Sequence, residues 1–407
     1  MRVQKSDRRL LTAITSRGSP ERLGPGGAED RARAAPLAKY MGVVEFNHLM
    51  PTLSVDRVKV DPATLSVNPD AFRIASSTIP GAGLSCYATR DIPASTNILG
   101  IHRSPIAGVI CQPFRKEVCA WCFSYNRGNI LKHKLETGGR NSRGVSWFCQ
   151  TPCIEAWRNE VTEEGARAIT AAEEALTRLH LTTPGTDEDS PCTANDIDSV
   201  WEEALSISEK ILKDRKRKPQ ARSVLRPAYF DVDDFRFILS GLISFHRNKE
   251  AISGVLQLGP SWSPYLTSRS KLIQHADILY FLTHALPLDS PILAYVTPYC
   301  ITALITRDSG NSFGIWDLQL AGQELFGYAM YPCASYFNHS CSPNLQKRRI
   351  GRFYEFITCC EVAEGEELCI SYLGGAEEGL DKQVRQKRLR EGWFFDCSCS
   401  RCREHGM

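Results

Sequence analysis

Sixteen cysteines stand in the 407-residue sequence, and several are grouped at the short intervals that metal sites use. Cys119 with Cys122, and Cys149 with Cys153, form two tight pairs that we call the N-terminal cysteine cluster. Four thiolates suit a tetrahedral structural Zn²⁺ with Zn–S distances of about 2.3 Å. The alternative is four reduced cysteines in a core, but the tight spacing favours zinc. We expect His133, between the pairs, at the surface rather than as a further ligand.

A second group lies near the end of the chain, where Cys397, Cys399 and Cys402 offer three thiolates. A closed structural site needs a fourth ligand. We expect Cys341, from the polar segment 338–344, to complete this C-terminal cysteine cluster. Three alternatives lie in strand-like apolar runs and are expected in the core: Cys359, Cys360 and Cys369. Five isolated cysteines are also predicted to be core residues: Cys86, Cys111, Cys192, Cys300 and Cys333.

Composition indicates a globular protein. The chain is 43% hydrophobic and 23% charged, which excludes a mostly disordered protein. The formal net charge is only +3, so we expect no direct binding to nucleic acid or membrane. No apolar run is long enough to span a membrane, and the N-terminal apolar stretch 10–14 is too short for a secretory signal. We therefore expect the protein in the nucleus, the cytoplasm or both. We also expect it to be a monomer.

The elements that must position these cysteines follow from the hydrophobic pattern. It divides the chain into a disordered basic tail (1–65), a small sheet (66–110), the cysteine-rich module (111–157), a helical insertion (158–290), a second β-rich part (291–375) and a charged helix with the cysteine triplet (376–407). Apolar stripes predict helices across 169–179, 200–211, 235–245 and 272–286. We expect loops at 182–196 and at the basic run 213–222. The final helix is predicted at 381–391, ending at Gly392.

Two polar segments in the β-rich part carry a resemblance to a known family. Residues 331–344 read Tyr-Pro-Cys-Ala-Ser-Tyr-Phe-Asn-His-Ser-Cys-Ser-Pro-Asn, and residues 365–372 read Gly-Glu-Glu-Leu-Cys-Ile-Ser-Tyr. These resemble the two C-terminal signatures of SET-domain protein lysine methyltransferases. With the Gly-Ala-Gly-Leu run at 81–84 and the closing cysteine triplet as a post-SET segment, the order matches that family over residues 66–407. The resemblance implies an α+β fold: a mainly β SET core with small sheets and a knot-like C-terminal segment, a helical insertion and two zinc-stabilised modules.

The cysteine-rich module is similar to the MYND finger of the SET-and-MYND branch. The N-terminal cysteine cluster matches the first of the two zinc sites of that finger, and Asn311-Ser312-Phe313-Gly314 also matches the branch. The ligands of the second site are missing, so the resemblance implies a reduced MYND-like module and about two zinc ions in the whole chain. These departures, with the helical insertion, are closer to the shorter SET proteins of fungi.

The resemblance implies transfer of a methyl group from S-adenosylmethionine to a lysine ε-amine of a histone in chromatin or of a non-histone protein. Tyr372 takes the catalytic role, with its hydroxyl orienting the amine or the methyl group; the alternative is an ordinary tyrosine at a strand end. Phe395 corresponds to an aromatic residue that packs on the adenine, or else packs only against zinc. The implied cofactor-binding residues are Gly81, Ala82, Gly83, Leu84, Asn338, His339, Tyr372 and Phe395. A second hypothesis is an inactive SET and zinc protein that acts as an interaction module.

Overall fold

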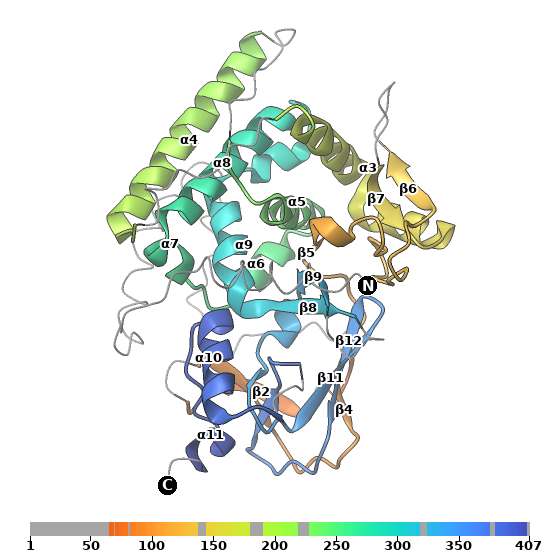
Figure 1. Ribbon diagram of the computed structural model, residues 1–407, viewed down its shortest axis with the longest axis vertical. Helices are drawn as coiled ribbons and strands as arrows, with labels where there is room; N and C mark the ends of the chain where they lie inside the picture. Colours follow the sequence, from red (N-terminus) through yellow and green to blue (C-terminus); the bar gives the residue numbers. More distant parts are fainter. Residues whose placement is uncertain are drawn as a thin grey trace.

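The computed structural model describes most of the chain after residue 64 (Figure 1). The described residues are 65–68, 70–79, 82–136, 144–179, 190–218, 228–317, 324–374 and 379–404. The predicted tail up to residue 64, Gly81 and parts of the two predicted loops, namely residues 182–189 and 219–222, lie outside them. Among the described residues, no helix is long and apolar enough to cross a membrane.

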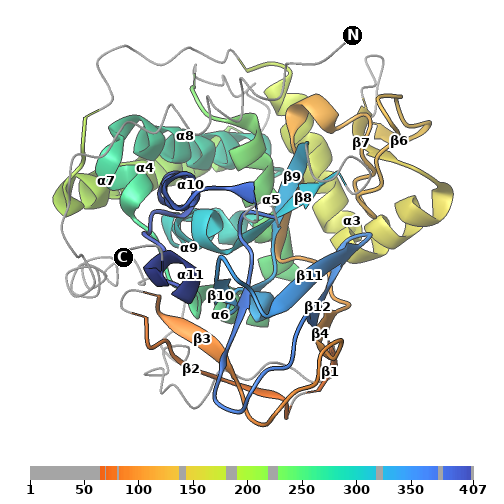
Figure 2. The same ribbon diagram turned by 60° about the horizontal axis from the view of Figure 1, so that its bottom comes forward.

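Strands from the two ends of the sequence pair with one another in three sheets. One sheet has the order β1 (Leu65–Val67), β4 (Asn97–Ile101), β12 (Phe353–Thr358), β11 (Leu345–Ile350). A second has the order β10 (Asn338–His339), β13 (Glu367–Ile370), β3 (Leu84–Ala88), β2 (Phe72–Ser76), and a third has the order β5 (Ala107–Ile110), β9 (Leu325–Met330), β8 (Ser312–Trp316). Figure 2 shows β2 and β3 on one side of the β-rich end and the β1–β4–β12–β11 sheet on the other. The chain between the two ends is thus an insertion into one β core.

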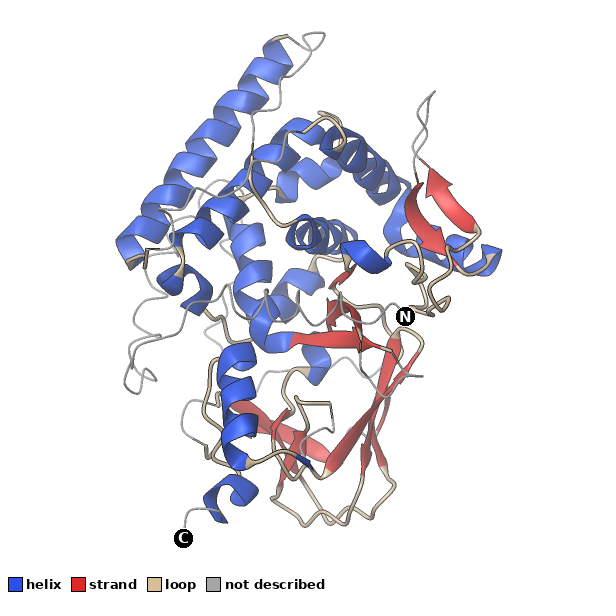
Figure 3. Ribbon diagram, in the orientation of Figure 1, coloured by secondary structure: helices blue, strands red, loops and turns tan. Residues whose placement is uncertain are grey.

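That insertion supplies most of the helices, which gather at one end of the molecule (Figure 3). They are α3 (Thr151–Leu176), α4 (Ala194–Arg217), α5 (Val232–Arg247), α6 (Glu250–Leu256), α7 (Ser263–Thr267), α8 (Arg269–Ala285) and α9 (Pro298–Asn311). The four predicted apolar stripes fall largely on α3, α4, α5 and α8. Short 3₁₀ turns are η4 (Gln112–Phe114), η5 (Pro291–Tyr295) and η6 (Pro332–Ala334).

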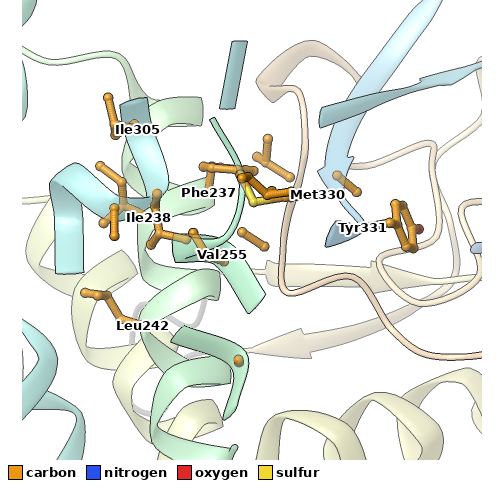
Figure 4. Close-up of a cluster of buried hydrophobic side chains, with 14 of the residues drawn as sticks. Phe237, Ile238, Leu242, Val255, Ile305, Met330 and Tyr331 are labelled. Carbon is orange, nitrogen blue, oxygen red and sulfur yellow. The ribbon is translucent and has the colours of Figure 1, made fainter. Parts of the chain in front are cut away.

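Helix α5 joins the helices to the β core. Its Phe237 is fully buried and lies beside Met330 of β9, and the fully buried Leu242 lies farther along the same cluster, which also includes Val255 and Ile305 (Figure 4). Burying such side chains removes their apolar surface from water, which stabilises the interface between the two parts. Helices and small sheets share one hydrophobic core, which confirms the predicted α+β class.

Several expectations about local structure are wrong. The predicted return of β structure at residue 291 begins only at β8, because α9 precedes it. The Thr297 side chain accepts a hydrogen bond from the N–H of Cys300, and Pro298 occupies the first turn, so capping chemistry starts a helix in spite of its β-branched residues. The first part of the predicted basic loop, up to Arg217, is helical. There Arg215 donates to the carbonyl oxygens of Thr283 in α8 and of Leu286 directly after that helix.

Two further differences concern the C-terminal half. Cys359 and Cys360 are exposed just after β12 rather than buried, because the chain turns there. Helix α10 (Lys382–Trp393) runs past Gly392 and ends at Phe394, which itself adopts the left-handed conformation with φ of +61°. A short helix, α11 (Ser400–Glu404), then carries the last cysteine.

Candidate functional site

The N-terminal cysteine cluster is assembled by a knuckle and the start of a helix. Cys119 and Cys122 precede the hairpin of β6 (His133–Glu136) and β7 (Gly144–Phe148), and Cys153 lies in the first turn of α3. The four Sγ atoms lie within 4.8 Å of one another, and that of Cys149 is 3.5 Å from those of Cys122 and Cys153. Four sulfurs around Zn²⁺ at about 2.3 Å would be about 3.8 Å apart. The spacing therefore fits a tetrahedral zinc ion, and His133 is not part of the cluster.

This cysteine-rich module is attached to the β core through Arg352, at the turn between β11 and β12. The guanidinium carbon of Arg352 lies 3.8 Å from the centroid of the Trp121 ring, inside the knuckle. The backbone carbonyl of Arg352 accepts a 2.5 Å hydrogen bond from the hydroxyl of Tyr331. Gly351 beside it has a φ of +62°, and a Cβ there would lie 3.5 Å from the carbonyl oxygen of Cys122. The module is thus held against the turn between β11 and β12, and this turn contacts Tyr331 at the start of the 331–344 signature.

The C-terminal cysteine cluster brings Cys341 to Cys397, Cys399 and Cys402, and all four are buried. The Sγ of Cys341 is 3.9 Å from that of Cys397 and 3.6 Å from that of Cys402. Burial raises the pKa of the Cys341 thiol to about 12, so a thiolate at this position requires a cation beside it. The alternative fourth ligands Cys359, Cys360 and Cys369 are not part of the cluster. This set also fits a tetrahedral zinc ion.

Tyr372 follows β13 and points its hydroxyl back toward the 331–344 signature. The hydroxyl donates a hydrogen bond to the carbonyl oxygen of Phe337 over 3.1 Å. Burial raises the pKa of Tyr372 well above its usual range, so the hydroxyl stays protonated at neutral pH. Because its proton is directed at Phe337, the oxygen can accept a hydrogen bond from a ligand.

Asn338 is oriented by the carboxylate of Glu367, a residue without an expected role from the sequence. Its Nδ2 donates to Oε1 of Glu367 over 3.0 Å and to the carbonyl oxygen of Leu84 over 3.5 Å. The Ser77 hydroxyl donates to the same carboxylate oxygen over 3.3 Å. The amide nitrogen is therefore engaged, and Oδ1 is the atom that Asn338 can present to a ligand. Glu367 lies in the 365–372 signature, but only its contacts with Asn338 and Ser77 in the folded chain show its role.

The glycine-rich run lies next to Asn338 through Leu84. Gly83 has a φ of +73°, a conformation that favours glycine, and a Cβ built on it would have nothing within 4 Å. The backbone here borders open space that a ligand can approach. Ala82 donates its N–H to the carbonyl oxygen of Ile79 over 3.1 Å, while Gly81 lies outside the described residues.

His339 connects Tyr372 to the C-terminal cysteine cluster. Its Nδ1 accepts the backbone N–H of Tyr372 over 3.1 Å, and its Nε2 lies 3.3 Å from the Sγ of Cys341. Both ring nitrogens thus contact protein atoms, which leaves the main chain of this residue for the predicted cofactor contact. The ring of Phe395 lies 6.1 Å from that of His339 and 6.3 Å from that of Tyr372. Phe395 therefore lies against both Tyr372 and the C-terminal cysteine cluster, and this position does not distinguish between its two predicted roles.

The sequence of the chain is similar to those of known proteins. The family model of the SET domain matches residues 83–373. A yeast protein, "Potential protein lysine methyltransferase SET6" of Saccharomyces cerevisiae, is 28% identical over 353 residues, which cover 79% of this chain and 92% of the yeast protein.

Other relatives match over shorter stretches. A SET and MYND domain-containing protein of Dictyostelium discoideum is 38% identical over 25% of this chain and 23% of its own length. The protein-lysine N-trimethyltransferase SMYD5 of Gallus gallus is 40% identical over 19% of each chain. A crystal structure of the SET domain of LSMT bound to lysine and AdoHcy covers 75% of this chain and 50% of its own with 10% identity and a TM-score of 0.23, a similarity too low to support any argument.

Proposed function

This chain belongs to the SET-domain family, and from that membership we propose that it is an S-adenosylmethionine-dependent protein-lysine N-methyltransferase. The observation that carries the proposal is a continuous set of contacts around one site. Leu84 contacts Asn338, its neighbour His339 contacts Tyr372, and His339 also contacts the C-terminal cysteine cluster. The residues that the family resemblance names for the cofactor and for catalysis, apart from Gly81, thus lie together. The methyltransferase names of the relatives support the same activity.

The reaction needs a neutral lysine amine and a well-placed electrophile. A lysine with an ordinary pKa of about 10.4 must lose its proton at pH 7, which costs about 4.6 kcal/mol. Apolar surroundings lower that pKa, and Phe337, whose carbonyl contacts the Tyr372 hydroxyl, is buried together with its sequence neighbour Tyr336. When bound, S-adenosylmethionine supplies a sulfonium methyl group that the amine attacks directly. The protein therefore has mainly to align the reacting groups.

We assign distinct tasks to the residues of the site. The oxygen of Tyr372 accepts a hydrogen bond from the lysine amine and orients it toward the methyl group. Gly83 leaves room for the methionine part of the cofactor, and Oδ1 of Asn338 accepts a hydrogen bond from it. Phe395 packs on the adenine. Each of the two cysteine clusters holds one structural zinc ion.

The partner is a protein that presents a lysine, either a histone tail or a non-histone protein. We propose that the enzyme works as a monomer in the nucleus, the cytoplasm or both, as its composition suggested. The competing function is a SET and zinc protein without turnover that acts only as an interaction module. Tyr372 and Asn338 favour the active enzyme, because a decayed site would be expected to lose one of them.

The test is incubation of the purified full chain with labelled S-adenosylmethionine and fractionated lysate, followed by mass spectrometry of labelled lysines. The Tyr372→Phe variant is the matched control. Labelled lysines that depend on Tyr372 support the proposal. Cofactor binding without methyl transfer to any fraction would favour the interaction module instead.

A further inference from the structure

Helix α10 places a buried arginine directly against the C-terminal cysteine cluster. Arg385 is only 2% exposed. Its Nη2 donates to the Sγ of Cys402 over 3.8 Å, and its guanidinium also interacts with the Cys341 side chain. Its Nη1 donates to the carbonyl oxygen of Leu380 over 2.5 Å. The side chain therefore ends at two of the four cysteines.

The surroundings of Arg385 lack an obvious counter-charge. A guanidinium keeps its proton in proteins, so burial does not neutralise it. Across the part of the chain that the structure describes, no carboxylate forms an ion pair with Arg385, and its buried Nε has no hydrogen-bond partner. A buried charge without a partner is strongly destabilising. Something beside Arg385 must carry negative charge in the folded protein.

The four cysteines supply that charge only as thiolates. Four neutral thiols would carry none, whereas one Zn²⁺ with four thiolates carries a net charge of −2. We propose that Arg385 is the counter-ion of a zinc–tetrathiolate centre formed by the C-terminal cysteine cluster, and that it strengthens zinc binding there. This inference rests on the zinc ion assigned under the proposed function and adds a residue that the cysteine spacing does not identify.

The proposal makes zinc and Arg385 depend on each other. The guanidinium offsets part of the negative charge of the buried centre, and the centre gives the guanidinium its partner. When zinc dissociates, Arg385 becomes an unpaired buried charge. The packing of α10 against the C-terminal cysteine cluster is then destabilised. Residues that contact a metal ligand in this way commonly change metal affinity by about 10- to 100-fold.

The experiment measures zinc release rather than methyl transfer, so its outcome is independent of whether the chain is an active enzyme. The zinc-loaded full chain is titrated with a chromogenic chelator that reports each ion released. The variants are Arg385→Gln and Arg385→Lys, and the matched control is Arg388→Gln, which alters an exposed arginine on the same helix. We expect Arg385→Gln to lower the affinity for one of the two zinc ions by about 10- to 100-fold. Arg385→Lys should lower that affinity less, and Arg388→Gln should leave the affinity for both zinc ions unchanged.

Three results would overturn the proposal. One is zinc affinity in Arg385→Gln within twofold of the parent for both ions, even if the melting temperature falls. Another is an equal loss of affinity for both zinc ions, which would mean general unfolding. If the glutamine variant does not fold, the lysine variant decides the case, because it keeps the charge. A lysine variant that folds but has lost that zinc ion as fully as a chain without Cys399 would show that charge is not what matters.

Discussion

The backbone N–H of Tyr372 donates a hydrogen bond to Nδ1 of His339 over 3.1 Å. The other ring nitrogen of His339 lies 3.3 Å from the Sγ of Cys341. One imidazole therefore separates the proposed catalytic tyrosine from a proposed zinc ligand. Metal ligands are commonly oriented by such outer contacts, and here the contact also fixes the backbone of the active site.

Tyr372→Phe should lower the methyl-transfer rate by roughly 10²-fold or more, equivalent to about 3 kcal/mol of transition-state stabilisation. The change removes only the hydroxyl that orients the amine. The ring and its packing, including the contact with Trp393 at 5.6 Å between ring centroids, remain. Single-turnover kinetics with a peptide substrate measures the effect.

Two controls separate catalysis from structure in that variant. The melting temperature should change little, because the lost hydrogen bond to Phe337 contributes about 1 kcal/mol. The affinity for S-adenosylmethionine should also be nearly unchanged. A normal rate in a folded variant would remove Tyr372 from the catalytic role.

The pH dependence of stability should report the raised pKa of Tyr372. The unfolded chain loses the phenol proton near pH 10, while the folded chain still holds it, so the unfolded state binds fewer protons above that pH. The stability associated with this residue is therefore fully present below about pH 10 and is lost as the pH rises further. Urea unfolding from pH 8 to 11 should show a steeper loss in the parent than in Tyr372→Phe. Parallel curves would contradict the burial of this hydroxyl.

Glu367→Gln should weaken binding of S-adenosylmethionine by about 10-fold. The carboxylate accepts hydrogen bonds from Asn338 and Ser77, and bonds to a charged acceptor contribute about 1.5–3 kcal/mol. A neutral amide keeps the shape but loosens Asn338. Isothermal calorimetry measures the affinity, with Glu361→Gln, an exposed position, as the control. Equal affinity in both variants would mean that Glu367 does not position Asn338.

Arg352→Ala should reduce the free energy of unfolding by about 2 kcal/mol, because a desolvated cation–π contact with Trp121 is lost. The matched control is Arg348→Ala on the same hairpin. Its side chain is 59% exposed and pairs with Glu355, a surface interaction worth at most about 1 kcal/mol. Urea unfolding of both variants distinguishes them. Similar small losses would show that the cysteine-rich module does not depend on Arg352 for its attachment.

The cysteine clusters show which metal ligands the spacing of cysteines in the sequence can predict. Their short spacing predicted that Cys119 lies near Cys122 and Cys397 near Cys402. The polar segment around Cys341 suggested the fourth ligand of the C-terminal cysteine cluster, and the structure brings Cys341 to that cluster. Strand pairing between the two ends of the chain could be expected only from the family resemblance, because the pairing depends on long-range contacts that local patterns do not encode.

Other features could not be predicted because their meaning depends on burial. Arg385 reads as one of several basic residues on a charged helix until the fold shows that it is buried at the cysteines. Glu367 likewise needs its neighbours Asn338 and Ser77 before its role is visible. The sequence of α9 predicts strands because of its β-branched residues, whereas in the fold Thr297 and Pro298 start a helix.

Metal analysis of the purified chain should find about two zinc ions, one for each cysteine cluster. Cys399→Ser should remove one of them and unfold the C-terminal segment, because a structural zinc ion contributes on the order of 10 kcal/mol of folding free energy. Affinity for S-adenosylmethionine should fall with it, since the cluster supports Tyr372 through His339. The control is Cys359→Ser, an exposed cysteine outside both clusters, which should retain both ions. A folded chain that contains no zinc would remove both metal assignments, together with the counter-ion role of Arg385.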